Sequence, residues 1–90
     1  MHQVHLIISG KVQGVYYRAS CQEIAIRYDL KGWVKNLSTG QVEVLAQGKK
    51  EKIEKFIAWC NKGPPNATVN NIKIKWQPLN GSYNIFEITY

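Results

Sequence analysis

The apolar residues of this chain recur at two different spacings, and the order of those spacings limits the fold more than any other feature. Val4, Leu6 and Ile8 occupy every second position, which is typical of a strand with one buried face. Residues 50–62 instead place their apolar side chains at i, i+3, i+4 and i+7, which predicts one apolar face of a helix. Pro64 then prevents that helix from continuing.

The same reasoning predicts an order of elements for the whole chain. The predicted elements are a strand at 4–9, a helix at 18–28, strands at 32–37 and 41–46, a helix at 50–62, and strands at 72–76 and 85–90. This β-α-β-β-α-β order, with its last β region divided by a turn, is the split βαβ or ferredoxin-like pattern. We therefore expect an α+β fold with two helices on one face of a mostly antiparallel sheet. The length is that of a single domain, 1–90.

The charge and the cysteine content indicate the kind of partner and compartment. The chain has 12 Lys and Arg against 6 Asp and Glu, a formal net charge of +6, which favours anionic partners and opposes self-association. No apolar run approaches the ~20 residues of a membrane span, and the chain starts without a signal-peptide pattern. Cys21 and Cys60 do not make a disulfide framework. We expect a cytoplasmic monomer that binds no membrane.

The segment between the first strand and the first helix is a candidate anion site. Gly10 and Gly14 allow a tight turn, and successive backbone N–H groups in such a turn can form a concave nest for an anion. The helix N-terminus adds free N–H donors, and Arg18 adds a planar guanidinium suited to phosphate oxygens. The same residues also fit an ordinary strand-to-helix turn with a solvated arginine.

Asn36, just before the predicted hairpin loop at 38–40, is a second candidate. A side-chain amide both donates and accepts hydrogen bonds, so it can orient a water molecule for attack. An asparagine at this place fits ordinary turn chemistry equally well.

Three segments of the chain resemble, in order and spacing, the signature segments of the acylphosphatase family: residues 10–18, 32–48 and 63–69. The resemblance spans nearly the whole chain. It implies a small cytosolic enzyme of ferredoxin-like fold that hydrolyses the carboxyl–phosphate bond of acyl phosphates without a metal or other cofactor. Inorganic phosphate would be its product and a competitive ligand.

The resemblance also implies roles for particular residues. Arg18 would bind the phosphoryl group, and Asn36 would position the attacking water. The phosphate-binding loop would consist of Gln13, Gly14, Val15, Tyr16, Tyr17 and Arg18. The carboxylate of Tyr90 could orient Arg18, or the terminus could simply be frayed. Tyr17 and Asp29 depart from the family pattern, which usually has Phe or Met at the first position and a helix-ending Gly at the second.

These residues suit hydrolysis of an acyl phosphate. The leaving group is a carboxylate whose acid has a pKa near ~4, so it leaves without being protonated. Phosphoryl transfer is mostly a matter of positioning and electrostatic stabilisation, so a nest, one arginine and one asparagine are sufficient in principle. The scarcity of carboxylates in the chain is therefore no obstacle.

Three other interpretations deserve comparison. Cys21 and Arg27 have the C-x5-R spacing of cysteine-dependent phosphatases, but the residues between them are typical of a helix interior, so we expect Cys21 in the core. His2 and His5 would face opposite sides of a strand, which argues against a metal site. A basic nucleic-acid-binding module of the same fold is the alternative function, and it predicts exposed aromatic side chains on the sheet.

Overall fold

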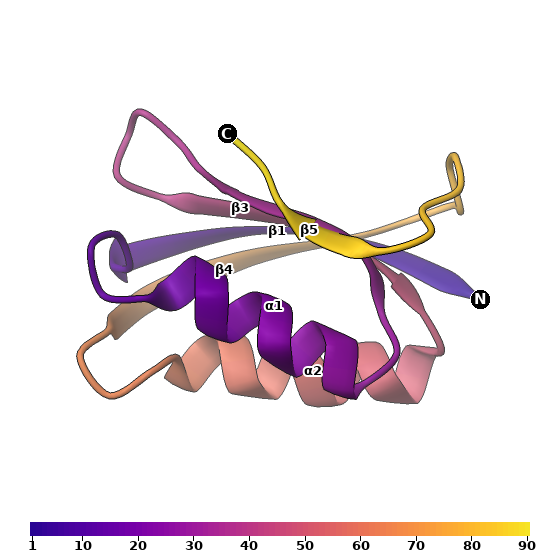
Figure 1. The fold of residues 1–90 in the computed structure, drawn as a ribbon, viewed down its shortest axis with the longest axis horizontal. Coiled ribbons are helices and arrows are strands. Elements are labelled where there is room, and N and C mark those ends of the chain that lie inside the picture. The colour runs from indigo at the N-terminus through magenta and orange to yellow at the C-terminus, as the bar shows by residue number, and fades with distance from the viewer.

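The fold follows the predicted order of elements in a computed structural model that describes residues 1–90. In chain order the elements are β1 (His2–Lys11), α1 (Tyr17–Arg27), β2 (Lys31–Asn36), β3 (Val42–Gly48), α2 (Lys50–Lys62), β4 (Thr68–Gln77) and β5 (Phe86–Ile88). Both helices lie on the same side of the sheet (Figure 1). No helix covers the other side of the sheet, so the core between helices and sheet takes one face of each strand.

The strands form one sheet in the order β4-β1-β3-β2-β5. β1 pairs antiparallel with β3 and β4, and β2 pairs antiparallel with β3. The one parallel pair joins β2 to β5. The arrangement confirms the predicted α+β, ferredoxin-like split βαβ fold with two helices on one face of a mostly antiparallel sheet. Because β2 and β5 run in the same direction, both strands finish at the same end of the sheet. The β1–α1 loop lies beside this end.

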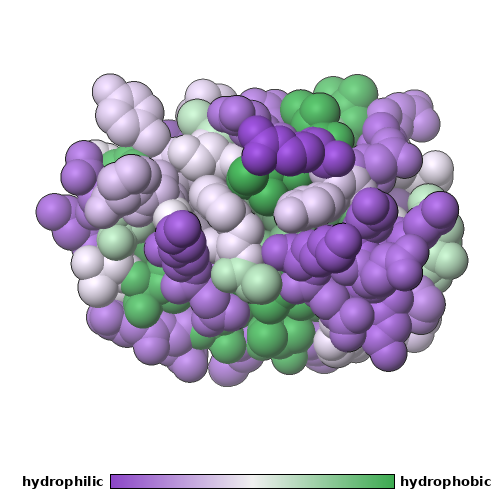
Figure 2. Space-filling model, turned by 90° about the horizontal axis from the view of Figure 1, so that it is seen from below, coloured by the Kyte–Doolittle hydropathy of each residue, from purple (hydrophilic) through white to green (hydrophobic).

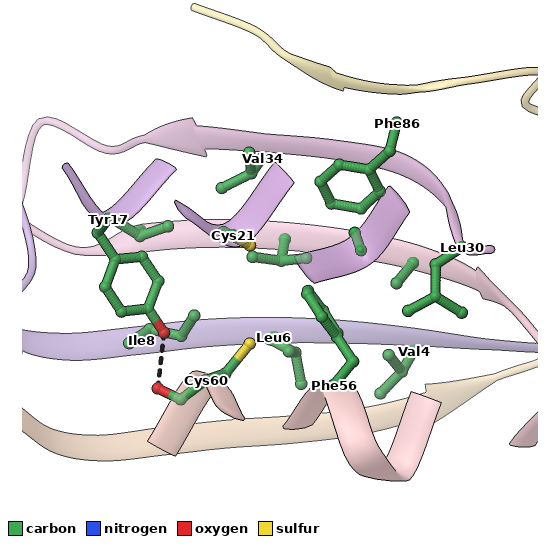
Figure 3. Close-up of a cluster of buried hydrophobic side chains, with 14 of the residues drawn as sticks. Val4, Leu6, Ile8, Tyr17, Cys21, Leu30, Val34, Phe56, Cys60 and Phe86 are labelled. Carbon is green, nitrogen blue, oxygen red and sulfur yellow. Dashed lines mark hydrogen bonds between the residues drawn. The ribbon is translucent and has the colours of Figure 1, made fainter. Parts of the chain in front are cut away.

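The core lies between the helices and the sheet (Figure 3). β1 supplies Val4, Leu6 and Ile8, whose side chains are fully buried, as their alternation predicts. The helices supply buried residues at helical spacing: Tyr17, Cys21 and Ala25 from α1, and Ile53, Phe56 and Cys60 from α2. This packing fixes α1 against the sheet and therefore fixes the position of its N-terminus.

Every strand boundary differs from the predicted one by about one to four residues, and the largest difference is at the start of β4. β4 begins at Thr68, four residues before the alternating segment, because it pairs with β1 as far as Lys11. Three of its first four residues are polar and exposed, so this part of the edge strand carries little strand signal. β5 is limited to Phe86–Ile88, because only these residues pair with β2.

The outer surface of the helices is mostly hydrophilic, with smaller apolar patches between the polar side chains (Figure 2). Neither helix combines the length and the apolar character needed to cross a membrane.

Candidate active site

The β1–α1 loop leaves a row of main-chain donors free. Gly14 and Tyr16 both have left-handed backbone conformations, with φ of 73° and 64°. The main-chain N–H groups of residues 13–16 donate to no acceptor in the protein, and the first helical bond of α1 runs from Ser20 N to Tyr16 O at 3.1 Å. The first turn of a helix likewise has N–H groups without helical partners. The loop and helix start therefore present free donors at the positive end of the helix dipole.

A pocket of about 400 Å³ lies against these donors. Its lining includes Gly14, Tyr16, Arg18, Asn36, Ile88 and Tyr90. The loop and α1 contribute the first three of these residues, the end of β2 contributes the asparagine, and the segment from β5 to the C-terminus contributes the last two. The structure thus brings the two predicted catalytic residues together, although they lie on different elements and are separated by 18 positions in the sequence.

Arg18 is the charged side chain of this pocket, and no carboxylate pairs with it. Its Cζ lies 5.3 Å from the centroid of the Tyr90 ring, a distance at which the ring quadrupole attracts a cation. The suggested contact from the Tyr90 carboxylate to Arg18 is absent, since no ion pair joins them within 4.0 Å. The ring, rather than the terminal carboxylate, is therefore the group of Tyr90 that approaches the guanidinium.

Asn36 is half-buried, and its Oδ1 is shielded from solvent without accepting a hydrogen bond from the protein. It is the one buried side-chain nitrogen or oxygen in the structure without a partner. Such groups are rare in native proteins, because leaving a buried acceptor unpaired costs about 1–3 kcal/mol. The unpaired oxygen lies on a residue that lines the pocket, so a donor bound there would satisfy it.

The side chain of Gln13 joins the β1–α1 loop to the neighbouring hairpin. Its Nε2 donates to the main-chain oxygens of Leu37 at 2.8 Å and Gln41 at 2.9 Å, both in the β2–β3 hairpin. The side-chain nitrogen is therefore engaged by the hairpin, and the free donor of Gln13 is its main-chain N–H. Gln41 in turn donates from Nε2 to Ser9 Oγ at 2.9 Å, which ties the hairpin to the end of β1.

Two further loop residues direct their side chains into the core. Val15 is buried and its side chain does not line the pocket. Its predicted role in the phosphate-binding loop therefore depends on its main-chain N–H alone. Tyr17 is buried against Trp59, with the ring centroids 5.5 Å apart. Sequence reasoning missed Ala19 and Ile88, which also line the pocket. Ile88 lies at the pocket because β5 pairs with β2. The alternation of apolar residues in the last strand does not reveal this pairing.

The phenol of Tyr17 has the hydrogen-bond partner that a buried tyrosine requires. Its Oη donates to the main-chain oxygen of Cys60 at 2.7 Å (Figure 3). In a continuing helix that oxygen would accept from residue 64, but Pro64 has no N–H. Tyr17 therefore caps the end of α2, and burial raises the pKa of its phenol far above the ordinary value of 10.0.

The C-x5-R spacing does not form a phosphate site. Cys21 is fully buried within α1, and burial raises the pKa of its thiol well above the ordinary value. Arg27 lies on the exposed side of the same helix, 3.5 Å from Glu23. A protonated thiol in the core and a solvated guanidinium cannot act on one phosphate. No three His, Cys, Asp or Glu side chains gather in a way that could hold a metal ion.

Known proteins resemble the chain over its full length. A family model described as acylphosphatase matches residues 4–88. The chain is 39% identical over 88 residues to an acylphosphatase of Pelotomaculum thermopropionicum, covering 98% of this chain and 96% of the relative. The crystal structure of acylphosphatase from Bacillus subtilis matches with a TM-score of 0.97 and 34% identity, covering 100% of both chains. An acylphosphatase structure from Coxiella burnetii matches with a TM-score of 0.93 and 39% identity, covering 98% of this chain and 92% of that one. As the three signature segments predict, the chain belongs to the acylphosphatase family.

Proposed function

We propose that this protein hydrolyses acyl phosphates to a carboxylate and inorganic phosphate by direct attack of water on phosphorus. The observation that carries the proposal is a single pocket in which free main-chain donors, an arginine without a carboxylate partner and an asparagine with an unpaired oxygen meet. The first two groups suit a phosphoryl group, and the third suits a water molecule. Membership of the acylphosphatase family supports the same reaction.

The phosphoryl group binds to the β1–α1 loop. Its oxygens accept hydrogen bonds from the free N–H groups of residues 13–16 and from the first turn of α1. Arg18 supplies a guanidinium that can donate two parallel hydrogen bonds to phosphate oxygens. The Tyr90 ring, 5.3 Å from Cζ, limits the directions that this side chain can take. Together these groups stabilise the charge of the transferring phosphoryl group.

Asn36 orients the attacking water. Its Oδ1 accepts a hydrogen bond from that water, which satisfies the one unpaired buried oxygen of the site. A bond forms from the water oxygen to phosphorus, and the bond from phosphorus to the acyl oxygen breaks with its electron pair leaving on the carboxylate. The water proton passes to a phosphate oxygen or to solvent. The leaving carboxylate is a weak base and needs no general acid.

The composition of the pocket supports a mechanism without a metal or other cofactor. Its lining contains no His, Cys, Asp or Glu, which are the side chains that usually bind metal ions. We expect inorganic phosphate to bind as product and competitive ligand on the same donors. A cytoplasmic, monomeric protein that binds neither membrane nor nucleic acid remains our expectation, and two free, buried thiols fit a reducing compartment.

The uncovered face of the sheet gives little support to the nucleic-acid alternative. The register aligns Trp33 with Leu45, and Leu45 with His5, across the middle of this face. Trp33 is half-buried, and Lys35 Nζ lies 5.3 Å from its ring centroid. Single-stranded nucleic acids bind on several aromatic side chains that stack successive bases. On this face Trp33 is the one tryptophan, because the exposed Trp76 pairs with the buried Val4 and therefore lies on the opposite face.

The proposal is tested by phosphate release from acetyl phosphate with a chelator present. We expect hydrolysis by the wild type, and a loss of about 10³-fold or more in kcat/KM for Arg18→Ala. Arg27→Ala is the matched control, because Arg27 is the other arginine of the same helix and points to solvent. Full activity of Arg18→Ala would remove the arginine from the mechanism. A wild-type protein without acyl phosphate hydrolysis would overturn the proposed function.

A further inference from the structure

We infer that the free edge of β4 binds an extended, acidic segment of a partner protein, which joins the sheet as an additional strand. β4 lies at one end of the strand order and pairs only with β1. It has ten residues, whereas β5 at the other edge has three. No main-chain group of a loop or helix cap bonds to residues 68–77. The N–H and C=O groups on the outer side of β4 are therefore free to pair with another strand.

The face of β4 that is turned toward the helices carries two apolar side chains that remain exposed. Ile74 pairs across the strands with Leu6, which is fully buried, so it points to the core side of the sheet. Trp76 pairs with Val4, which is also fully buried. Ile74 is nevertheless 44% exposed and Trp76 41% exposed, so the helices leave this part of the edge uncovered. Neighbouring large apolar side chains at the surface are typical of a site that binds a partner.

The opposite face of β4 carries two lysines. Lys73 and Lys75 alternate with the apolar residues along the strand, so they point to the other side of the sheet. Both are exposed, and neither takes part in an ion pair. A strand that pairs with residues 72–76 therefore meets apolar side chains on one face and ammonium groups on the other. Its own side chains are complementary to this edge when apolar residues alternate with Asp or Glu.

Charge also argues against a second copy of this chain as the partner. In an antiparallel pair of two β4 strands centred on Ile74, Lys73 of each copy would lie opposite Lys75 of the other. Like charges in directly opposed positions destabilise a strand pair, and the net charge of +6 on each copy adds to the repulsion. Lysines on an edge strand are a common protection against such self-pairing. The same two lysines attract an acidic strand.

The inference is tested by titrating isotope-labelled protein with a capped pentapeptide of sequence Val-Glu-Val-Glu-Val and following the amide signals by NMR. We expect the shifts to be concentrated in residues 68–77, and the outer N–H groups of β4 to exchange more slowly with solvent when the peptide is bound. The matched control peptide, Val-Val-Val-Glu-Glu, has the same composition and charge without the alternation. It should bind at least about tenfold more weakly, since it cannot present apolar and acidic side chains on separate faces.

Two double variants separate the charge of this edge from the charge of the whole protein. Lys73→Glu with Lys75→Glu should weaken binding of the alternating peptide by about tenfold or more, because attraction across the strands becomes repulsion. Lys55→Glu with Lys62→Glu makes the same change of net charge on the exposed side of α2, and the affinity should change less than about threefold. Melting temperatures of both variants show whether each is folded.

The contradicting results are specific. Equal binding of the two peptides, or equal loss in the two double variants, would show attraction by net charge alone and overturn the inference. Shifts outside β4 would place the site elsewhere. Absence of peptide binding together with concentration-dependent shifts of residues 68–77 would assign this edge to a second copy of the chain. None of these results bears on the hydrolysis of acyl phosphates, because Lys73 and Lys75 do not line the pocket of the candidate active site.

Discussion

The Nε2 of Gln13 lies 2.8 Å from the main-chain oxygen of Leu37, so the candidate phosphate loop is hydrogen-bonded to the residue that follows Asn36. A second bond, to Gln41 O at 2.9 Å, reaches the other side of the same hairpin. One side chain therefore sets the spacing between the anion donors and the asparagine proposed to hold water. Gln13 is a positioning residue in this arrangement, since its side-chain nitrogen is not directed at the substrate.

Gln13→Ala should lower kcat by about tenfold or more, because a misplacement of about 1 Å between reacting groups can cost 10²-fold in rate. It should also lower the free energy of unfolding by about 1–2 kcal/mol, since two carbonyl oxygens lose a donor. The matched control is Gln22→Ala, which removes a bond of the same type, to Phe86 O at 3.0 Å, outside the pocket. Steady-state kinetics well below the melting temperature and urea unfolding measure both effects.

A structural role alone would make Gln13→Ala and Gln22→Ala alike. Both would then lose stability and keep the wild-type kcat at low temperature. The positioning role requires that kcat falls in Gln13→Ala only. Glutamate at position 13 should not restore it, because a carboxylate cannot donate to the hairpin carbonyls.

Asn36→Ala should separate catalysis from phosphate binding. We expect kcat to fall by about 10²–10³-fold, while the inhibition constant of inorganic phosphate changes less than about threefold. Stability should be unchanged or slightly higher, because the substitution removes a buried oxygen without a partner. Asn71→Ala, on the exposed edge strand β4, is the control for loss of an amide. Weaker phosphate binding with an unchanged kcat would instead assign Asn36 to the anion site.

The sequence was sufficient to predict the order of elements and the two polar residues that meet in the pocket. Alternating and helical spacings are local, so they report each element without its partners. Arg18 and Asn36 could be predicted because each belongs to a signature segment and lies at or near the end of a predicted element. The orientations of Gln13 and Val15 could not be found, because they depend on left-handed turns at neighbouring loop residues. The approach of the Tyr90 ring to Arg18 depends on the pairing of β5 with β2, which is a non-local contact.

Tyr17→Phe should lower the free energy of unfolding by about 1–2 kcal/mol near pH 7, because Cys60 O loses its donor and Pro64 cannot replace it. The difference in the free energy of unfolding between the wild type and Tyr17→Phe should become smaller at high pH. Burial raises the pKa of the Tyr17 phenol, so the folded state keeps a proton that the unfolded state loses above pH 10.0. Stability from this group is therefore complete below pH 10.0 and decreases above it, by about 1.4 kcal/mol per pH unit.

Urea unfolding of the wild type and Tyr17→Phe between pH 7 and 11 measures this difference. The other tyrosines and both cysteines are present in both proteins, so their titration cancels to first order. If the unfolding free energies of the two proteins differ by the same amount up to pH 11, Tyr17 ionises equally in the folded and unfolded states. That result would contradict the burial that the structure shows.

Asp29→Gly should stabilise the protein by about 0.5–1 kcal/mol without changing activity. Asp29 has a φ of 57° at the end of α1, where its N–H donates to Ile26 O at 3.0 Å and the next N–H, of Leu30, donates to Ala25 O at 2.9 Å. This is a Schellman motif, whose left-handed position glycine fills without strain. Removing a negative charge from a helix C-terminus adds to the gain, and the exposed contact with Lys31 at 3.4 Å contributes little.

Asp29→Ala is the control, because it removes the charge and keeps the strained Cβ. Thermal unfolding should rank glycine above aspartate and alanine, and equal stability of Asp29→Gly and Asp29→Ala would contradict the strain argument.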